Sequence, residues 1–312
     1  MNKHSSLRTS GSLLERAAEL YGFEVPTARA PAAAPEAAPV PQPRPEPEVL
    51  AAPMPAPKAP ADFMEEGRPL TRARPGGCAS VERERLREGG FIDPDAPAGA
   101  LAEEFRIVKR QLLLALKPGK GQTVLVCSAQ PDEGKTFCAI NLALSLAAER
   151  DTDVLLVDGD FSKPEILSLL GVEGGAGLVD ALADPKLDPE SLVIRTDIGG
   201  LSVLPAGRHV NNVTELLGAE RTREVLTRLT EGSPKRIVIF DSPPALMASP
   251  ATVLAAHAGQ LLMVVRADET SEADLKEALG LLSACDNVSL LLNGAAFAAN
   301  GRRFGSYYGY GQ

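Results

Sequence analysis

A glycine, a lysine and a threonine stand together shortly after a run of apolar residues. The run covers Thr123–Ser128, and the triplet is Gly134, Lys135 and Thr136. Where a strand turns into a helix, backbone N–H groups point at phosphate oxygens, a lysine adds positive charge and a threonine hydroxyl can bind Mg²⁺. This spacing therefore predicts a phosphate-binding loop. The residues expected to contact the nucleotide are Gln130, Pro131, Asp132, Glu133, Gly134, Lys135, Thr136 and Phe137.

The loop departs from the full pattern G-x-x-x-x-G-K-[ST], because Ala129 stands where the first glycine belongs. A plain turn between a strand and a helix, with Thr136 as a cap, is the structural alternative. The apolar strand before the loop and the apolar periodicity of the helix after Lys135 favour phosphate binding over that alternative.

Aspartates follow two further apolar runs. Asp158 and Asp160 come directly after Val154–Val157, and Asp241 follows Arg236–Phe240. In an open parallel sheet, ligands bind beyond the carboxyl ends of the strands. Mg²⁺ takes few carboxylates and completes its shell with water and phosphate oxygens. The sequence therefore predicts a site for Mg²⁺ and a nucleotide. The expected metal-binding set is Thr136, Asp158, Asp160 and Asp241.

These residues need an alternating framework to bring them together. Continuous Val/Ile/Leu runs predict strands that are covered on both faces, and their alternation with helical patterns predicts an α/β fold with a doubly wound, mainly parallel sheet. The predicted strands are 123–128, 154–157, 201–204, 236–240, 261–265 and 288–292. The predicted helices are 100–117, 134–150, 164–170, 178–183, 213–230 and 272–284.

Composition narrows the function classes. The chain has 312 residues, a net charge of -9 and 44% hydrophobic residues, so we expect a globular protein that binds no nucleic acid. Its four cysteines lack CxxC spacing, which argues against a zinc site and fits a reducing cytosol. No apolar run approaches the roughly 20 residues of a membrane span. We therefore expect a cytoplasmic protein.

Four regions are expected along the chain. Residues 1–25 carry a short amphipathic helix, either a fraying end or a docking helix, and residues 26–99 read as a Pro/Ala-rich and polar linker, mostly disordered, with a helical turn or two at Val81–Glu88. Residues 100–296 read as the nucleotide-binding domain, and residues 297–312 as a flexible tail rich in tyrosine and glycine.

The motifs together resemble the bacterial tyrosine kinases of exopolysaccharide assembly, and more narrowly the autokinases found beside exosortase systems. The family loop S-x-x-P-G-E-G-K-[ST] matches Ser128 to Thr136, with Asp132 in place of a glycine. The modified Walker A′ motif maps onto Val157–Asp160, and the Walker B aspartate onto Asp241. The resemblance implies a P-loop NTPase fold of the MinD/ParA-like type. It also implies an ATP-dependent protein-tyrosine kinase, with Asn293 as an adenine contact.

The chemistry expected from this resemblance assigns roles to four residues. Asp158 is the candidate to accept the proton of the attacking tyrosine hydroxyl, and Lys135 and Mg²⁺ neutralise charge on the transferred phosphoryl group. Asp241, with Asp160 sharing the metal, would hold Mg²⁺.

The family motif Glu-x-x-Arg-x-x-Lys/Arg maps onto Glu103, Arg106 and Lys109. In the family this helix forms homo-oligomers, so the resemblance implies a ring. We expect the three side chains to project from the side opposite the apolar stripe that contains Phe105, free to meet a neighbouring copy. Ordinary surface ion pairs along one helix are the alternative.

Three of the four tyrosines lie in the last six residues, at Tyr307, Tyr308 and Tyr310. The resemblance implies that they are the phosphate acceptors, phosphorylated in trans within the ring. It also implies a transmembrane chain-length determinant, or polysaccharide co-polymerase, as a separate activator. The chain would then be peripheral to the inner membrane only through that partner.

Two other functions stay open at this stage. A MinD/ParA-like positioning ATPase would carry a second lysine early in the loop, and Gln130–Glu133 contains none. A non-catalytic scaffold of polysaccharide export would bind ATP and transfer nothing.

Overall fold

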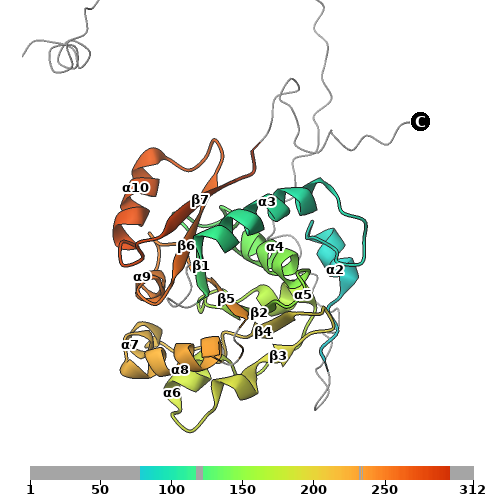
Figure 1. Cartoon of the computed structure of the whole chain (residues 1–312). Coiled ribbons are helices and arrows are strands. Elements are labelled where there is room, and N and C mark those ends of the chain that lie inside the picture. The colour runs from blue at the N-terminus through green and yellow to red at the C-terminus, as the bar shows by residue number, and fades with distance from the viewer. Residues whose placement is uncertain (1–77, 117–121, 232, 234, 296–312) are drawn as a thin grey trace, which may run out of the picture. The chain divides into compact units, whose positions relative to one another are not determined.

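The computed structural model describes residues 78–116, 122–231, 233 and 235–295 (Figure 1). Within them a seven-stranded sheet has the order β3-β4-β2-β5-β1-β6-β7. All neighbouring strands are parallel except β3, which runs antiparallel to β4 at one edge. The strands are β1 (Thr123–Ser128), β2 (Asp153–Asp158), β3 (Ile194–Arg195), β4 (Leu201–Leu204), β5 (Arg236–Asp241), β6 (Gln260–Arg266) and β7 (Val288–Asn293).

Helices cover both faces of this sheet, because successive strand residues point to opposite faces and both sets are apolar. Val124 and Val126 of β1 join one core cluster, and Leu125 and Cys127 join the other. The first cluster includes residues of α2 (Arg83–Glu88), α3 (Ala100–Ala115), α4 (Lys135–Ala147) and α5 (Ile166–Leu170). The second includes residues of α6 (Leu178–Ala183), α7 (Val213–Leu217), α8 (Glu220–Glu231), α9 (Pro250–Ala255) and α10 (Glu272–Leu281).

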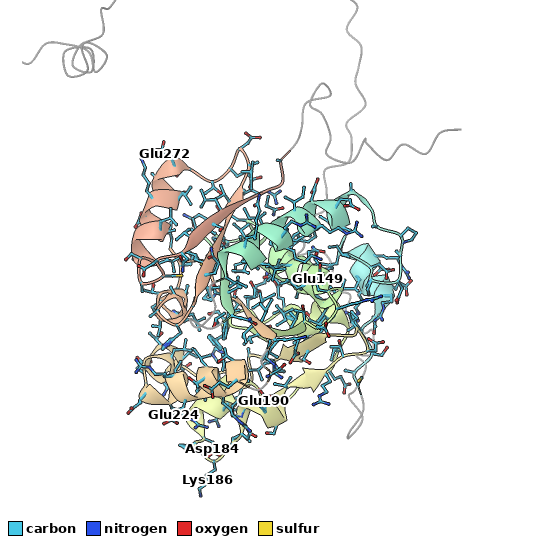
Figure 2. All side chains as sticks on the ribbon, in the orientation of Figure 1. Glu149, Asp184, Lys186, Glu190, Glu224 and Glu272 are labelled. Carbon is cyan, nitrogen blue, oxygen red and sulfur yellow. The ribbon has the colours of Figure 1, made fainter. Side chains whose placement is uncertain are left out.

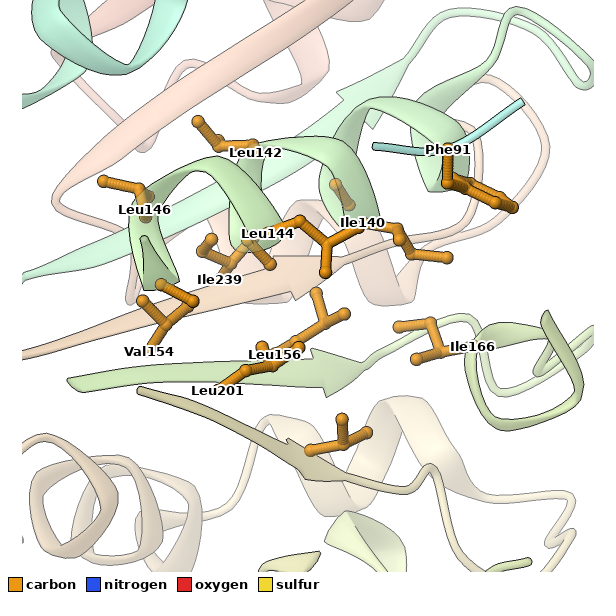
Figure 3. Close-up of a cluster of buried hydrophobic side chains, with 14 of the residues drawn as sticks. Phe91, Ile140, Leu142, Leu144, Leu146, Val154, Leu156, Ile166, Leu201 and Ile239 are labelled. Atoms are coloured by element: carbon orange, nitrogen blue, oxygen red, sulfur yellow. The ribbon is translucent and has the colours of Figure 1, made fainter. Parts of the chain in front are cut away.

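The helix that follows the phosphate loop, α4, lies in the middle of the first layer. Figure 3 shows its Ile140 and Leu144 above Leu156 of β2 and Ile239 of β5. Ten consecutive residues of α4, from Cys138 to Ala147, are buried. The start of this helix is therefore fixed by packing before any ligand binds.

The predicted α/β class and the mainly parallel sheet are confirmed, and each predicted strand is present with ends within a residue of the prediction. The predicted helix 213–230 is wrong as one element, because it is divided into α7 and α8. In a continuous helix, the Leu216 carbonyl would accept the N–H of residue 220. Here it accepts the hydroxyl of Thr222 at 2.9 Å instead. The helix α9, the short strand β3 and the 3₁₀ helix η2 (Pro189–Leu192) were not predicted.

The edge strand β7 does not match the expectation of strands covered on both faces. Its Val288, Leu290 and Leu292 are 44%, 59% and 61% exposed, and the pairing with β6 puts them on the same face as Leu261 and Met263. An apolar run alone does not reveal which strand lies at the edge of the sheet.

The predicted C-terminal boundary of the linker, residue 99, is wrong, because the fold already includes residues 78–99. Residues 78–99 were assigned to it, yet Ala79, Val81, Leu86 and Phe91 are buried in the first core cluster. Ala79 forms a parallel bridge with Thr196, which extends the edge of the sheet. The expected helical turn at Val81–Glu88 is present as α2. The many charged residues of 78–99 suggested a linker. A few apolar side chains are nevertheless enough to pack this segment onto the fold.

The expected N-terminal helix, linker residues 26–77 and the tyrosine tail lie outside the described residues. Among the helices that the structure describes, none combines the length and the apolar character needed to cross a membrane.

Candidate functional site

The phosphate loop and the strand-end aspartates meet at one edge of the sheet. Strand β5 lies between β1 and β2, so Asp241 pairs in register with Val126 on one side and with Asp158 on the other. Asp160 follows two residues after the end of β2. The topology thus brings together three motifs that are up to about a hundred residues apart in the sequence.

The loop has a backbone shaped for anion binding. Asp132 and Gly134 both have left-handed conformations, with φ of 59° and 91°, and alternating backbone of this kind points successive N–H groups into a concavity. Asp132 therefore adopts the conformation that a glycine would adopt more easily. The helix α4 begins at Lys135, and its first N–H groups have no acceptor within the helix.

Two glycines of the site leave no room for a side chain. A Cβ on Gly134 would lie 2.1 Å from Nδ2 of Asn293, and a Cβ on Gly159 would lie 2.6 Å from the carbonyl oxygen of Asp241. The Gly159 N–H donates to that same carbonyl at 2.8 Å. The loops after β2 and β5 are thus in direct backbone contact, and the phosphate loop lies against the Asn293 side chain.

Lys135 lies against the carboxylates. Its Nζ is 3.2 Å from Oδ2 of Asp160, and both side chains are mostly buried. Burial alone would lower the pKa of Lys135, but the charges of Asp241 and Asp160 outweigh it and raise the pKa. The lysine is therefore a permanent cation, held where a phosphate group can compete with Asp160 for it.

The aspartates are buried far more deeply than carboxylates usually are, with Asp158 2% and Asp241 1% exposed. Burial, followed by the charge of Asp241, raises the pKa of Asp158 to about 8. Burial also raises the pKa of Asp241 to about 7, although Lys135 and a hydrogen bond with Thr136 act in the opposite direction. Such groups need a cation or a proton to be stable in this place.

The carboxylates have free oxygen atoms for such a cation or for a proton. Oδ1 of Asp158 and Oδ1 of Asp241 are buried without a hydrogen-bond partner in the described structure, while Ile166 N–H donates to Oδ2 of Asp158 at 3.2 Å. The described residues contain no group of three or more His, Cys, Asp or Glu placed to hold a metal ion. The arrangement fits Mg²⁺, which takes the rest of its ligands from phosphate and water.

Several side chains that were predicted to contact the nucleotide instead contact other residues of the protein. The Glu133 carboxylate accepts the Gln130 N–H at 2.9 Å and the Thr270 hydroxyl, and Asn293 donates Nδ2 to the Glu133 carbonyl at 2.9 Å. The Phe137 ring packs on Phe91, with 5.4 Å between the ring centroids. Thr270 was missed, because a single threonine in a loop carries no motif.

The prediction that Lys109 projects freely is wrong. Lys109 is 8% exposed, its Nζ donates to the Ser145 carbonyl at 3.0 Å, and it forms an ion pair with Glu149. Glu149 follows two residues after the end of α4 and is labelled in Figure 2. Lys109 lies on the buried side of α3 with Phe105 and Leu112, whereas Arg106 is exposed and pairs with Glu103. A charged residue type suggested exposure, but the helical spacing places it inside.

Several curated proteins are similar to this chain over more than half of its length. Tyrosine-protein kinase Wzc of Salmonella typhimurium is 30% identical over 227 residues, which are 73% of this chain and 31% of Wzc. The putative tyrosine-protein kinase EpsB of Ralstonia nicotianae is 30% identical over 230 residues, 70% of this chain and 29% of EpsB. Tyrosine-protein kinase Etk of Escherichia coli K12 is 30% identical over 188 residues, 60% of this chain and 25% of Etk.

The chain thus spans between a quarter and a third of the length of these relatives. No protein-family model matches it. The solved kinase domain of E. coli Etk superposes with a TM-score of 0.61 and 28% identity, covering 68% of this chain and 82% of that domain. The BceF tyrosine kinase domain superposes with a TM-score of 0.52 and 25% identity, covering 61% of this chain and 76% of that domain.

Proposed function

Because the chain belongs to the family of bacterial tyrosine-protein kinases, we propose that it is an ATP-dependent protein-tyrosine autokinase. It transfers the γ-phosphate of ATP to Tyr307, Tyr308 and Tyr310. One observation carries the proposal. An anion-binding loop with a buried lysine lies beside two buried carboxylates, and each carboxylate has an oxygen without a partner.

Each side chain of the site has a role in this reaction. Lys135 leaves Asp160 for the β- and γ-phosphates of ATP, and the N–H groups at the start of α4 bind the same phosphates. Thr136 and Asp241, already hydrogen-bonded to each other, would hold Mg²⁺, with Asp160 nearby to share it. When bound, Mg²⁺ neutralises the charge that builds up on the transferred group.

Asp158 is the proposed acceptor of the tyrosine proton. A tyrosine hydroxyl has a pKa of about 10 and is protonated at pH 7, so its attack on phosphorus benefits from a nearby base. Burial raises the pKa of Asp158 and favours its protonated form when no cation is present, so a cation bound beside it at Asp241 would hold it ionised and able to accept the proton. Its free Oδ1 is the atom that takes the proton.

The acceptor tyrosines come from a neighbouring copy in a homo-oligomeric ring. Glu103 and Arg106 lie on the exposed side of α3, together with Ile107 and Leu114, which are 41% and 82% exposed. This side of α3 supports an oligomer contact. Each phosphotyrosine adds nearly two negative charges, so crowded phosphorylated tails would repel one another and loosen the ring.

The family gives the proposed setting. The kinase would regulate polymerisation and export of an exopolysaccharide, activated by a separate transmembrane chain-length determinant. It would act at the cytoplasmic face of the inner membrane and bind the membrane only through that partner.

Intact-mass measurement tests the proposal directly. The dephosphorylated full chain is incubated with ATP and Mg²⁺, and peptides are then mapped. We expect wild type to gain phosphates within the last six residues, whereas Lys135→Met gains none because the transferred charge is no longer neutralised.

The matched control replaces Tyr307, Tyr308 and Tyr310 with phenylalanine, which removes the acceptors and leaves the nucleotide site intact. Wild-type protein that binds ATP but gains no phosphate, also after addition of its activator, would support the non-catalytic scaffold instead.

A further inference from the structure

Hydrogen bonds from Thr270, after β6, and from Asn293 of β7 hold the phosphate loop on the side away from the proposed metal-binding aspartates. Glu133 stands at the centre of this attachment and is 4% exposed. Its carboxylate accepts two hydrogen bonds, one from within the loop at Gln130 and one from Thr270. Its carbonyl accepts a third, from Asn293. A buried carboxylate is stable only while such donors remain in place.

Thr270 links this carboxylate to the turn between β6 and α10. Its hydroxyl donates to Oε1 of Glu133 and at the same time accepts the Arg266 N–H at 2.8 Å. Among uncharged side chains of this size, only a hydroxyl can donate and accept through one atom. This turn is itself hydrogen-bonded to β7, since the Ala267 N–H donates to the Asn293 carbonyl at 2.8 Å.

The attachment lies beside Gln130 and Pro131, the first half of the loop, which has no N–H group available for phosphate. Pro131 has no N–H, and the Gln130 N–H is occupied by Glu133. Phosphate must therefore be bound by N–H groups from residue 132 onward, whose direction depends on where the Glu133 backbone is held. The side chains of Thr270 and Asn293 determine that position from outside the loop.

We infer that Thr270 is a positioning residue for the nucleotide, and that its hydroxyl holds the Glu133 side chain so that the phosphate loop is preformed before ATP arrives. The inference rests on the proposed function only in taking an adenine nucleotide as the ligand of the loop. It assigns to the turn between β6 and α10 a part in nucleotide affinity without any contact to the nucleotide.

Calorimetric titration of the full chain with ATP and Mg²⁺ tests this role. Thr270→Val removes the donor and the acceptor while keeping the shape of the side chain. We expect the dissociation constant for ATP to rise about tenfold, the typical effect of losing one hydrogen bond to a charged group. Thr270→Ser keeps the hydroxyl and should restore affinity to within about twofold.

A second readout separates positioning from general stability. Hydrogen exchange of the peptide covering 128–137 should speed up in Thr270→Val without nucleotide, and the kcat of tail phosphorylation should change less than the KM for ATP. Thr270→Ala, which adds no methyl group against the Glu133 carboxylate, repeats these measurements if the valine variant does not fold.

Thr222→Val is the matched control. Thr222 is fully buried and donates to the Leu216 carbonyl at 2.9 Å, in the helical layer away from the loop. This variant should lower the melting temperature and leave ATP affinity unchanged.

The inference is overturned if Thr270→Val and Thr270→Ala bind ATP like wild type, or if Thr270→Ser weakens binding as much as they do. Because the titration reads binding alone, it stays decisive even if the wild-type protein transfers no phosphate to its tail.

Discussion

Asp158 and Asp241 are two buried carboxylates held next to each other at neighbouring strand ends. In the absence of a cation, both have pKa values raised well above that of an exposed aspartate, to about 8 and about 7. Folding therefore stabilises their protonated forms. A site that is costly to ionise when empty is well suited to bind a divalent cation, because the cation removes that cost.

This cost predicts how stability depends on pH. Since the folded pKa values are higher than those of the unfolded chain, the folded state binds more protons between about pH 4 and pH 8, and stability falls as pH rises through that window. With a chelator and without nucleotide, the melting temperature should be lower at pH 8 than at pH 6.

Asp158→Asn is the control for this prediction, because an amide resembles the protonated carboxyl group in shape and carries no charge. The variant should melt higher than wild type at pH 8, with a smaller difference at pH 5. Equal pH profiles for the two proteins would contradict the assigned burial cost.

At the residue level, the sequence predicted the parts of the site that carry a motif. Lys135, Thr136 and the three aspartates were placed correctly at the edge of one sheet, since their types and their strand-end positions are local signals. The partners of Glu133 were not predictable in this way. Thr270 and Asn293 are brought to the loop by sheet order, which pairs β6 with β1 and β7 with β6.

At the scale of elements, α3 has two different sides. Lys109 faces α4 and donates to the Ser145 carbonyl, one of the last carbonyls of that helix, which have no N–H donor within it. Its positive charge also interacts favourably with the C-terminal end of α4. Arg106 faces outward. The motif Glu-x-x-Arg-x-x-Lys thus divides here between a surface part and a part that joins α3 to the helix of the phosphate loop.

Paired substitutions should separate the two sides. Lys109→Met should lower the free energy of unfolding by about 1–2 kcal/mol, because a buried carbonyl and the Glu149 carboxylate lose their partner. Arg106→Met should change it by less than about 0.5 kcal/mol, as exposed ion pairs contribute little.

Light scattering of the same two proteins completes the comparison. Arg106→Met should reduce the size of the oligomer. Lys109→Met should leave that size unchanged and lower the melting temperature and the urea midpoint of unfolding. If Lys109→Met unfolds like wild type and dissociates the oligomer, Lys109 belongs to the contact surface and the division is wrong.

At the scale of the whole molecule, hydrophobic periodicity predicted the layered α/β architecture, because a parallel sheet buries long runs of Val, Ile and Leu. It did not predict that residues 78–99 pack onto this fold. There, Ile92 N–H donates to the buried Asn141 side chain at 2.8 Å, and Phe91 packs on Phe137 directly after the loop. Isolated apolar residues within a charged segment have no period, so only the folded structure reveals their contacts.

The same contacts connect the segment before α3 with the start of α4. The phosphate loop and its helix α4 are consequently held by three attachments, which come from residues 89–93, from α3 through Lys109 at the far end of α4, and from the turn between β6 and α10 through Thr270. All three hold the loop or its helix in place without contributing to the chemistry.

The central claim is that a magnesium-bound triphosphate binds at Gly134–Thr136 between the lysine and the aspartates. Calorimetric titration of the purified full chain with ATP, with and without Mg²⁺, tests it most directly. We predict one site per chain, with binding that weakens at least tenfold in Lys135→Met and that loses its dependence on Mg²⁺ in Asp241→Asn. Absence of ATP uptake by the folded wild-type protein, or unchanged binding in both variants, would contradict the account.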